Sequence, residues 1–71
     1  MFNVNKLKAK IVEKGMNMDE FARFTGLTKG KIYRRFKHPS EITIEEVDKI
    51  ADVLDVNQDE AVSIFFTQYV S

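Results

Sequence analysis

A stretch of nine residues, 29–37, carries five cationic side chains and no acidic one. The five are Lys29, Lys31, Arg34, Arg35 and Lys37. If this stretch is a helix, Lys29 and Lys31 oppose the helix dipole in its first turn, each at a cost of about 0.3–1 kcal/mol. Gly30 between them costs up to about 1 kcal/mol relative to alanine. A segment that opposes its own helical propensity is a candidate functional site.

The chemistry that this segment suits is the binding of a polyanion. Free backbone N–H groups at a helix N-terminus attract phosphate, and lysines there add positive charge. Glycine leaves room where another backbone must approach closely. The alternative for a charge run alone is a solvated basic face, and at this point both interpretations remain open.

Helical geometry indicates which side chains of the segment face outward. If Ile32 faces the core, a turn of about 100° per residue directs a set of others to solvent. These are Gly30, Arg34 and Lys37, with Lys31 and Tyr33 flanking them. Arginine can pair with guanine through two hydrogen bonds, and lysine can reach guanine or phosphate. Tyr33 could contact a phosphate oxygen or a thymine methyl group.

Start and stop signals place this segment third among five helices. Gly15 and Gly26 are suited to end the first two helices in the left-handed conformation. The capping residues that begin the next four are Asn17, Thr28, Thr43 and Asn57. The expected helices lie at about residues 5–14, 18–25, 29–37, 44–54 and 58–69. Strand signals are weak, so the pattern predicts a compact all-α fold, with residues 1–71 as a single domain.

The tight connection between the second and third helices carries a resemblance. The pattern Phe21-Ala22-x3-Gly26-Leu27-Thr28-x3-Ile32 is similar to the helix-turn-helix (HTH) of phage repressor and Cro-type regulators, here at about residues 17–37. A small Ala22 lets the third helix cross, and Gly26 supplies the positive φ of a sharp turn. The resemblance covers about residues 5–66. It implies a five-helix, lambda-repressor-like domain whose third helix enters the major groove of double-stranded DNA.

The resemblance also implies roles for individual residues. The positions that read bases in the family fall on Lys29, Gly30, Lys31, Tyr33 and Arg34. Gly30 has no side chain, so Lys29, Lys31 and Arg34 are the stronger candidates. The candidates for contact with the DNA backbone are Arg23, Thr28, Arg35 and Lys37. Two positions depart from the family: Met18 replaces a glutamine that often grips phosphate, and Phe36-Lys37-His38 replaces Glu-Asn-Gly.

The last expected helix has more apolar surface than a core-facing stripe needs. This surplus predicts a protein interface that includes Phe65, Phe66 and Tyr69, with Phe24 of the second helix as a further candidate. The alternative is that Phe65 or Phe66 folds back over the first helix. Two partners fit an interface: a second copy in a homodimer, or a cognate phage repressor, as for the small modulators of repression that the chain also resembles.

Charge is distributed unevenly along the chain. Ten of the 11 Lys and Arg residues lie in residues 1–38, and eight of the 11 Asp and Glu residues lie in residues 39–71. The asymmetry suggests a basic face for nucleic acid and an acidic face that could dock a basic partner. It is equally consistent with neutralisation of one half by the other across the fold.

Other classes of function are disfavoured by composition. The chain has no cysteine and one histidine, His38, which excludes a Cys/His metal cluster and a thiol nucleophile. Capping explains the paired carboxylates Glu45-Glu46 and Asp59-Glu60, so we expect no enzyme, no cofactor and no small-molecule substrate. No apolar run approaches the roughly 20 residues of a membrane span, and no signal peptide is recognised, so we expect a cytoplasmic location.

Together these patterns predict a sequence-specific DNA-binding transcriptional regulator of the phage or prophage Cro-repressor type. The alternative, from a different class, is an antirepressor that acts mainly by binding a cognate phage repressor.

Overall fold

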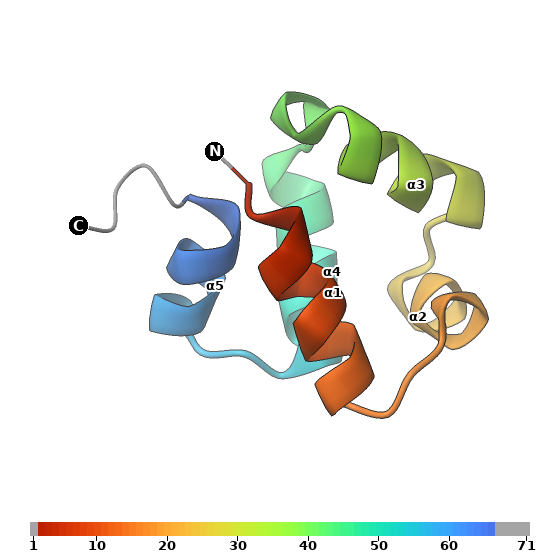
Figure 1. Cartoon of the computed structure of the whole chain (residues 1–71), viewed down its shortest axis with the longest axis horizontal. Coiled ribbons are helices and arrows are strands. Elements are labelled where there is room, and N and C mark those ends of the chain that lie inside the picture. The colour runs from red at the N-terminus through yellow and green to blue at the C-terminus, as the bar shows by residue number, and fades with distance from the viewer. Residues whose placement is uncertain (1, 67–71) are drawn as a thin grey trace.

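The computed structural model describes residues 2–66, which form helices, turns and connections and contain no strand. The elements are α1 (Val4–Glu13), α2 (Met18–Thr25), α3 (Lys29–Lys37), the short 3₁₀ helix η1 (Pro39–Glu41), α4 (Ile44–Leu54) and α5 (Gln58–Phe65). The expected all-α, five-helix architecture is therefore confirmed. In Figure 1, α1 and α4 occupy the middle of the molecule, with α5 on one side and α2 and α3 on the other.

Side-chain caps set most of the helix starts, as the sequence predicts. The side chains of Asn17 and Thr43 each accept a hydrogen bond from the backbone N–H three residues on. In turn, the side chains of Glu20 and Glu46 accept from the backbone N–H of Asn17 and Thr43. Each such capping box satisfies two backbone donors that would otherwise lack a partner. The first helix begins earlier than the expected Asn5, because Asn3 is its cap and accepts from the Lys6 N–H at 3.1 Å.

The core is assembled from one face of each helix. Its most completely buried large side chains are Leu7 of α1, Phe21 of α2 and Leu54 of α4. Ile32 of α3 and Ile64 of α5 complete the contacts from the remaining helices. Since α3 contributes one fully buried side chain, most of its circumference remains available to solvent.

The N-terminal segment covers α5, which corrects the expected interface there. Phe2 is buried, and its ring centroid lies 5.2 Å from that of Phe65. The Asn3 N–H also donates to the Ile64 carbonyl at 2.6 Å. Phe65 is consequently 3% exposed and is a core residue rather than a partner-binding one. Phe66 is partly buried against the same core, so the apolar surplus of α5 is largely absorbed within the chain.

The fifth helix is also shorter than the sequence suggested. It ends at Phe65, and the backbone leaves helical geometry at Phe66, with φ −132° and ψ 50°. Tyr69, the remaining interface candidate of the expected longer helix, lies outside the described residues.

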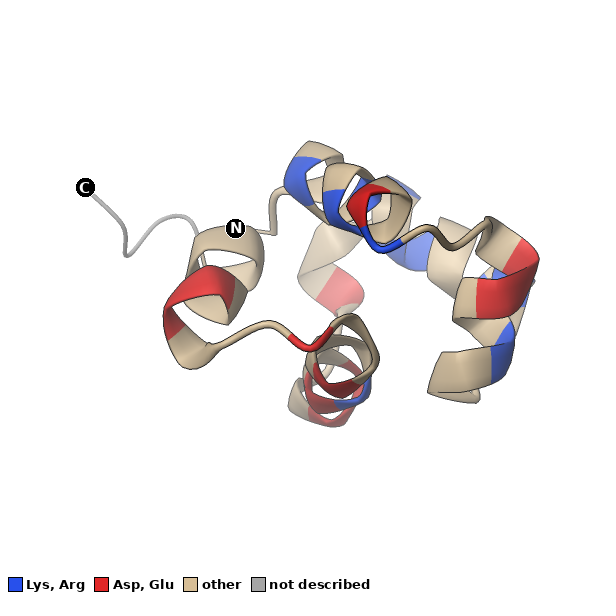
Figure 2. Cartoon of the chain, turned by 90° about the horizontal axis from the view of Figure 1, so that it is seen from below, with Lys and Arg blue, Asp and Glu red and all other residues tan. Residues whose placement is uncertain are grey.

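The two kinds of charge separate in space only in part. In Figure 2, α4 and α5 carry mostly acidic segments and α1 mostly basic ones, while α2 also begins with acidic segments. Ion pairs nevertheless join the basic and acidic halves of the chain, and one of them lies between α1 and α5, where Lys10 Nζ is 2.8 Å from Glu60 Oε2. A hydrogen bond to Glu13, followed by the one to Glu60, raises the pKa of Lys10, and the hydrogen bond from Lys10 lowers the pKa of Glu60.

Candidate nucleic-acid interface

The turn between α2 and α3 has the geometry that the sequence predicts. Gly26 is in the left-handed region, with φ 77° and ψ 7°, and its N–H donates to the Ala22 carbonyl at 3.0 Å. The Thr25 hydroxyl donates to that same carbonyl at 3.0 Å and accepts from the Leu27 N–H at 3.3 Å. The buried side chains of Ala22 and Leu27 hold the connection against the core. The turn is therefore short and rigid, and it fixes where α3 begins.

The outward face of α3 is exposed as expected. Ile32 is buried, whereas Gly30, Arg34 and Lys37 are exposed. An open hollow of about 540 Å³ lies along one flank of this face. Its lining residues are Thr28, Gly30, Lys31, Arg34, Arg35 and Glu41. The Thr28 hydroxyl accepts from the Lys31 N–H at 3.1 Å, and its own proton remains available to a phosphate oxygen.

Arg35 has a different position from the one that the sequence suggested. Its Nε and Nη2 donate to the two carboxylate oxygens of Glu46, at 2.7 and 3.0 Å, and its side chain is 16% exposed. The hydrogen bond from Arg35 is the main reason that the pKa of Glu46 is lowered, and the Thr43 N–H contributes at 3.0 Å. Arg35 thus joins α3 to α4. The hydrogen bonds to Glu46 use Nε and Nη2 of Arg35, and a contact of Arg35 with DNA phosphate stays a prediction.

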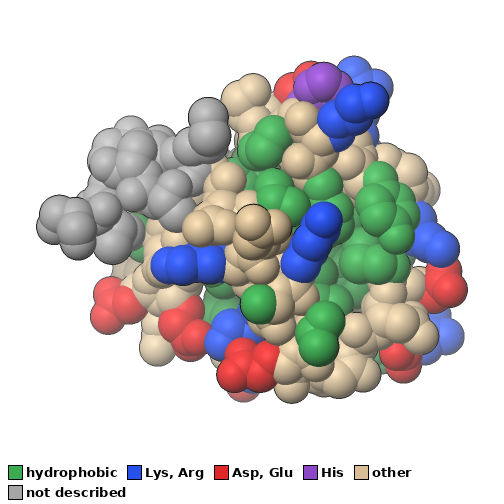
Figure 3. All heavy atoms as spheres, viewed as in Figure 1, with side chains coloured by type: hydrophobic (Ala, Val, Ile, Leu, Met, Phe, Trp, Pro, Cys, Tyr) green, Lys and Arg blue, Asp and Glu red, His purple; other side chains and the backbone are tan. Residues whose placement is uncertain are grey.

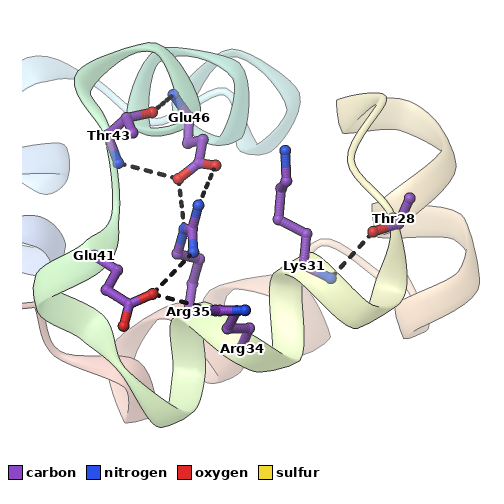
Figure 4. A network of polar contacts seen from close by, with 7 residues as sticks. All are labelled: Thr28, Lys31, Arg34, Arg35, Glu41, Thr43 and Glu46. Carbon is purple, nitrogen blue, oxygen red and sulfur yellow. Dashed lines mark hydrogen bonds and ion pairs between the residues drawn. The ribbon is translucent and has the colours of Figure 1, made fainter.

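Glu41 is a member of the site that sequence reasoning missed. Its Oε1 accepts from Arg34 Nε at 3.2 Å and lies 3.6 Å from Arg35 Nη1 (Figure 4). Glu41 belongs to η1, after the chain has reversed at Pro39. Arg34 and Glu41 are seven residues apart, but α3 ends at Lys37 before η1 begins, so helical periodicity does not predict the pair.

The lysines of the first turn of α3 diverge. Lys29 Nζ lies 2.9 Å from Asp19 Oδ1 of α2, and this hydrogen bond raises the pKa of Lys29. Lys31 instead extends from α3 toward the side where Glu46 lies (Figure 4). Both lysines remain exposed, but only Lys31 lines the hollow beside Arg34.

The opposite flank of α3 is apolar. The half-exposed ring of Tyr33 packs edge-on against Phe36 with centroids 5.9 Å apart. Lys8 Nζ lies 5.3 Å from the centroid of Phe36. Figure 3 shows green side chains gathered between α1 and α3 on this face. They belong to a groove of about 370 Å³ lined by Lys8, Ile11, Val12, Met16, Asn17, Met18, Tyr33 and Phe36.

Two further candidates lie on the surface of α2. Arg23 is exposed, with its guanidinium 5.3 Å from the centroid of the Phe24 ring. Phe24 is 56% exposed, which is unusual for a large aromatic side chain. Phe24 is therefore accessible to a protein partner, whereas Phe65 is not.

The comparison with protein families decides the class of this fold. The model of the Cro/C1-type HTH DNA-binding domain matches residues 6–65. The chain belongs to this family. No curated protein and no solved structure matches the chain. In this Cro/C1-type domain, α2 and α3 are the two helices of the HTH, and the family supports a role as a DNA-binding regulator.

Among residues 2–66, no group of three or more His, Cys, Asp or Glu side chains is arranged to hold a metal ion. Within the same part of the chain, no helix combines the length and apolar character of a membrane span.

Proposed function

We propose that this Cro/C1-type domain is a sequence-specific transcriptional regulator of phage or prophage type, with α3 in the major groove. One observation carries the proposal: the left-handed turn at Gly26 presents an α3 whose outward face is basic, open and without a side chain at Gly30. A groove-inserted helix needs such a face, since base edges must come within hydrogen-bond distance of its side chains.

The residues take separate roles in this arrangement. Arg34 is the principal base reader, because its side chain is 67% exposed at the centre of the face. Lys31 and Lys29 read bases near the start of α3, with Lys29 leaving Asp19 to do so, and Tyr33 contacts the groove from the apolar flank. Thr28, Lys37 and Arg23 bind phosphates. Gly30 contributes by allowing close approach of the DNA backbone.

The proposal is tested by selection from a randomised double-stranded DNA library, followed by titration of the enriched duplex and a scrambled one at several salt concentrations. We expect the wild-type chain to enrich one sequence. Arg34→Ala should lose about 1–3 kcal/mol of discrimination between the two duplexes. Lys49→Ala is the matched control: it also removes one cation, but from the exposed face of α4. If the wild-type chain enriches no sequence, the proposal is wrong. An equal loss of affinity for both duplexes would remove Arg34 as a base reader.

A second candidate function is that of an antirepressor that binds a cognate phage repressor. The observation that favours it is the number of large apolar side chains at the surface, namely Val12, Phe24, Tyr33 and Ile44. Gel shifts of the intergenic DNA beside the gene for this chain, measured with and without the repressor, distinguish the two functions. Salt-sensitive binding by the chain alone supports the regulator, and binding only with the repressor present supports the antirepressor.

A further inference from the structure

The carboxylate of Glu41 lies within the basic surface that the proposed function assigns to DNA. We propose that Glu41 is a specificity-determining residue: it positions Arg34 for base reading and makes the same arginine a poor clamp for phosphate. This inference rests on the proposed function.

The backbone holds Glu41 in place independently of its side chain. Pro39 begins η1, the Glu41 N–H donates to the His38 carbonyl at 3.0 Å, and the Ile42 N–H donates to the Pro39 carbonyl at 3.2 Å. The η1 turn packs against α3, so the position of the Glu41 backbone relative to that helix is set by the fold.

A chain of contacts runs from the interior to Arg34. Glu46, whose side chain is 8% exposed, holds Arg35 through two hydrogen bonds. Arg35 Nη1 lies 3.6 Å from Oε1 of Glu41, and the same oxygen accepts from Arg34 Nε at 3.2 Å. Exposure rises along this chain, from 8% at Glu46 through 42% at Glu41 to 67% at Arg34. Glu41, which also lies beside the largely buried Arg35–Glu46 pair, therefore restrains the more exposed side chain of Arg34.

The hydrogen bond to Glu41 uses only the inner nitrogen of Arg34. Among residues 2–66, Arg34 donates one side-chain hydrogen bond, from Nε. The two terminal amino groups are left for an external acceptor. Guanine offers two acceptors, O6 and N7, on its major-groove edge, and the paired donors of arginine match them. Holding the guanidinium at Nε thus directs the part that recognises guanine outward and reduces the conformational entropy lost on binding.

The negative charge of Glu41 has a second effect. Non-specific binding to DNA depends on the pairing of cations with phosphates, whatever the sequence. Among the described residues that line the hollow, Glu41 is the acidic one, and it already neutralises part of the charge of Arg34 and Arg35. A phosphate that approached Arg34 would meet this carboxylate, whereas the edge of a guanine carries no net charge. Glu41 therefore weakens binding to all sequences and weakens it least for the correct one.

Two variants separate positioning from charge. Glu41→Gln keeps an oxygen that can accept from Arg34 Nε but removes the charge, and Glu41→Ala removes both. Glu45→Gln is the matched control, because Glu45 is 80% exposed at the start of α4 and its ion pair is with Lys49, at 3.5 Å. All are titrated with the duplex that the wild-type chain selects from a randomised library, with single-base variants of it and with a scrambled duplex. Thermal melting of each chain monitors folding.

We expect Glu41→Gln to bind the scrambled duplex more tightly than Glu45→Gln does, and to keep the wild-type base preference. Glu41→Ala should in addition lose about five- to 100-fold of the discrimination at one guanine position, the position that Arg34→Ala also affects. If Glu41→Ala does not fold, the comparison of Glu41→Gln with Glu45→Gln can still overturn the inference, because it tests the effect of the charge.

Three outcomes would overturn the inference. The first is equal binding of the scrambled duplex by Glu41→Gln and Glu45→Gln. The second is a folded Glu41→Ala chain that keeps full discrimination at the position affected by Arg34→Ala. In both cases the proposed DNA-binding function stands, because the wild-type chain has selected a sequence. The third is a wild-type chain that selects none, which overturns the proposed function together with the inference.

Discussion

Lys37 and Arg34 both lie on the outward face of α3, but we expect Lys37 to bind phosphate and Arg34 to read a base. Lys37 is the last residue of the helix, and Arg34, one turn earlier, lines the hollow. Contacts with phosphate carry no sequence information, whereas contacts with base edges do. The difference between the two residues is therefore one between affinity and specificity, and salt dependence can separate them.

The first prediction concerns Lys37. Lys37→Ala should weaken binding to every duplex by a similar factor and reduce the slope of log affinity against log salt by about one unit, because one fewer counterion is released. Titrations at four salt concentrations measure the slope, with Lys49→Ala as the control on α4. An unchanged slope would remove Lys37 from the phosphate contacts.

The second prediction concerns the Arg35–Glu46 pair. The pKa of Glu46 is lowered in the folded state, chiefly by the hydrogen bond from Arg35. A carboxyl group with a lowered folded pKa stabilises the protein above its unfolded pKa, about 4.3 for glutamate, and loses that contribution as pH falls through the folded value. The unfolding free energy of the wild-type chain should therefore decrease as pH falls below about 4. Glu46→Gln should show a smaller decrease over that range.

Denaturant unfolding at a series of pH values measures this effect. Glu45→Gln provides the control, since it removes one acid from the same helix without touching Arg35. At neutral pH, Glu46→Ala should cost about 2–4 kcal/mol, because Arg35 would remain partly buried without its partner. A wild-type pH dependence in Glu46→Gln would show that the pair contributes little to stability.

At the scale of the element, the HTH depends on two glycines for different reasons. Gly26 has a φ of +77°, which an L-residue with a Cβ rarely adopts, while Gly30 is in a helix. An added Cβ would have no heavy atom within 4 Å at either position, so steric clashes do not differ between them. The conformation of the backbone alone should then determine the sign of the effect on stability.

The third prediction follows from this contrast. Gly26→Ala should destabilise the fold by about 1–2 kcal/mol, and Gly30→Ala should stabilise it by up to about 1 kcal/mol. Despite that gain, Gly30→Ala should bind DNA more weakly, because the new methyl group stands on the face that approaches the DNA backbone. Urea unfolding and duplex titration measure the two quantities. Tight binding by a stabilised Gly30→Ala chain would contradict a close approach at this position.

At the scale of the whole molecule, the exposed apolar side chains lie on different elements from those that the sequence suggested. Phe65 is buried under Phe2, whereas Phe24 is exposed on α2. The apolar groove between α1 and α3 adds Val12 and Tyr33 to the exposed set. If the domain binds a two-fold operator as a homodimer, the exposed Phe24 of α2 is a better candidate for the dimer contact than the buried Phe65 of α5.

The fourth prediction tests self-association through Phe24. The wild-type chain should scatter light at twice the mass of one chain at high concentration, and Phe24→Ser should scatter as a monomer. Since Phe24 is exposed, the substitution should change stability by no more than about 0.5 kcal/mol. Phe65→Ser serves as the contrast, because loss of a buried aromatic ring should lower the unfolding free energy instead. A monomeric wild-type chain would contradict the homodimer.

The sequence by itself determined the order and approximate extent of the five helices, four of their N-terminal caps and the turn of the HTH. These features depend on hydrogen bonds and backbone angles within a few residues, such as the Asn17–Glu20 capping box or the positive φ of Gly26. The outward face of α3 was predictable for the same reason. Once Ile32 faces the core, helical periodicity sets the direction of Arg34 and Gly30.

Only the tertiary structure decided which charged groups pair. Arg35 meets Glu46, Arg34 meets Glu41 and Lys29 meets Asp19 because particular helices cross there. The burial of Phe65 likewise depends on where Phe2 is placed. In each case the two partners belong to different elements, and their distance depends on crossing angles that no local periodicity contains. The sequence could therefore locate the basic helix, but only the packed fold could separate its structural cations from those that remain for a ligand.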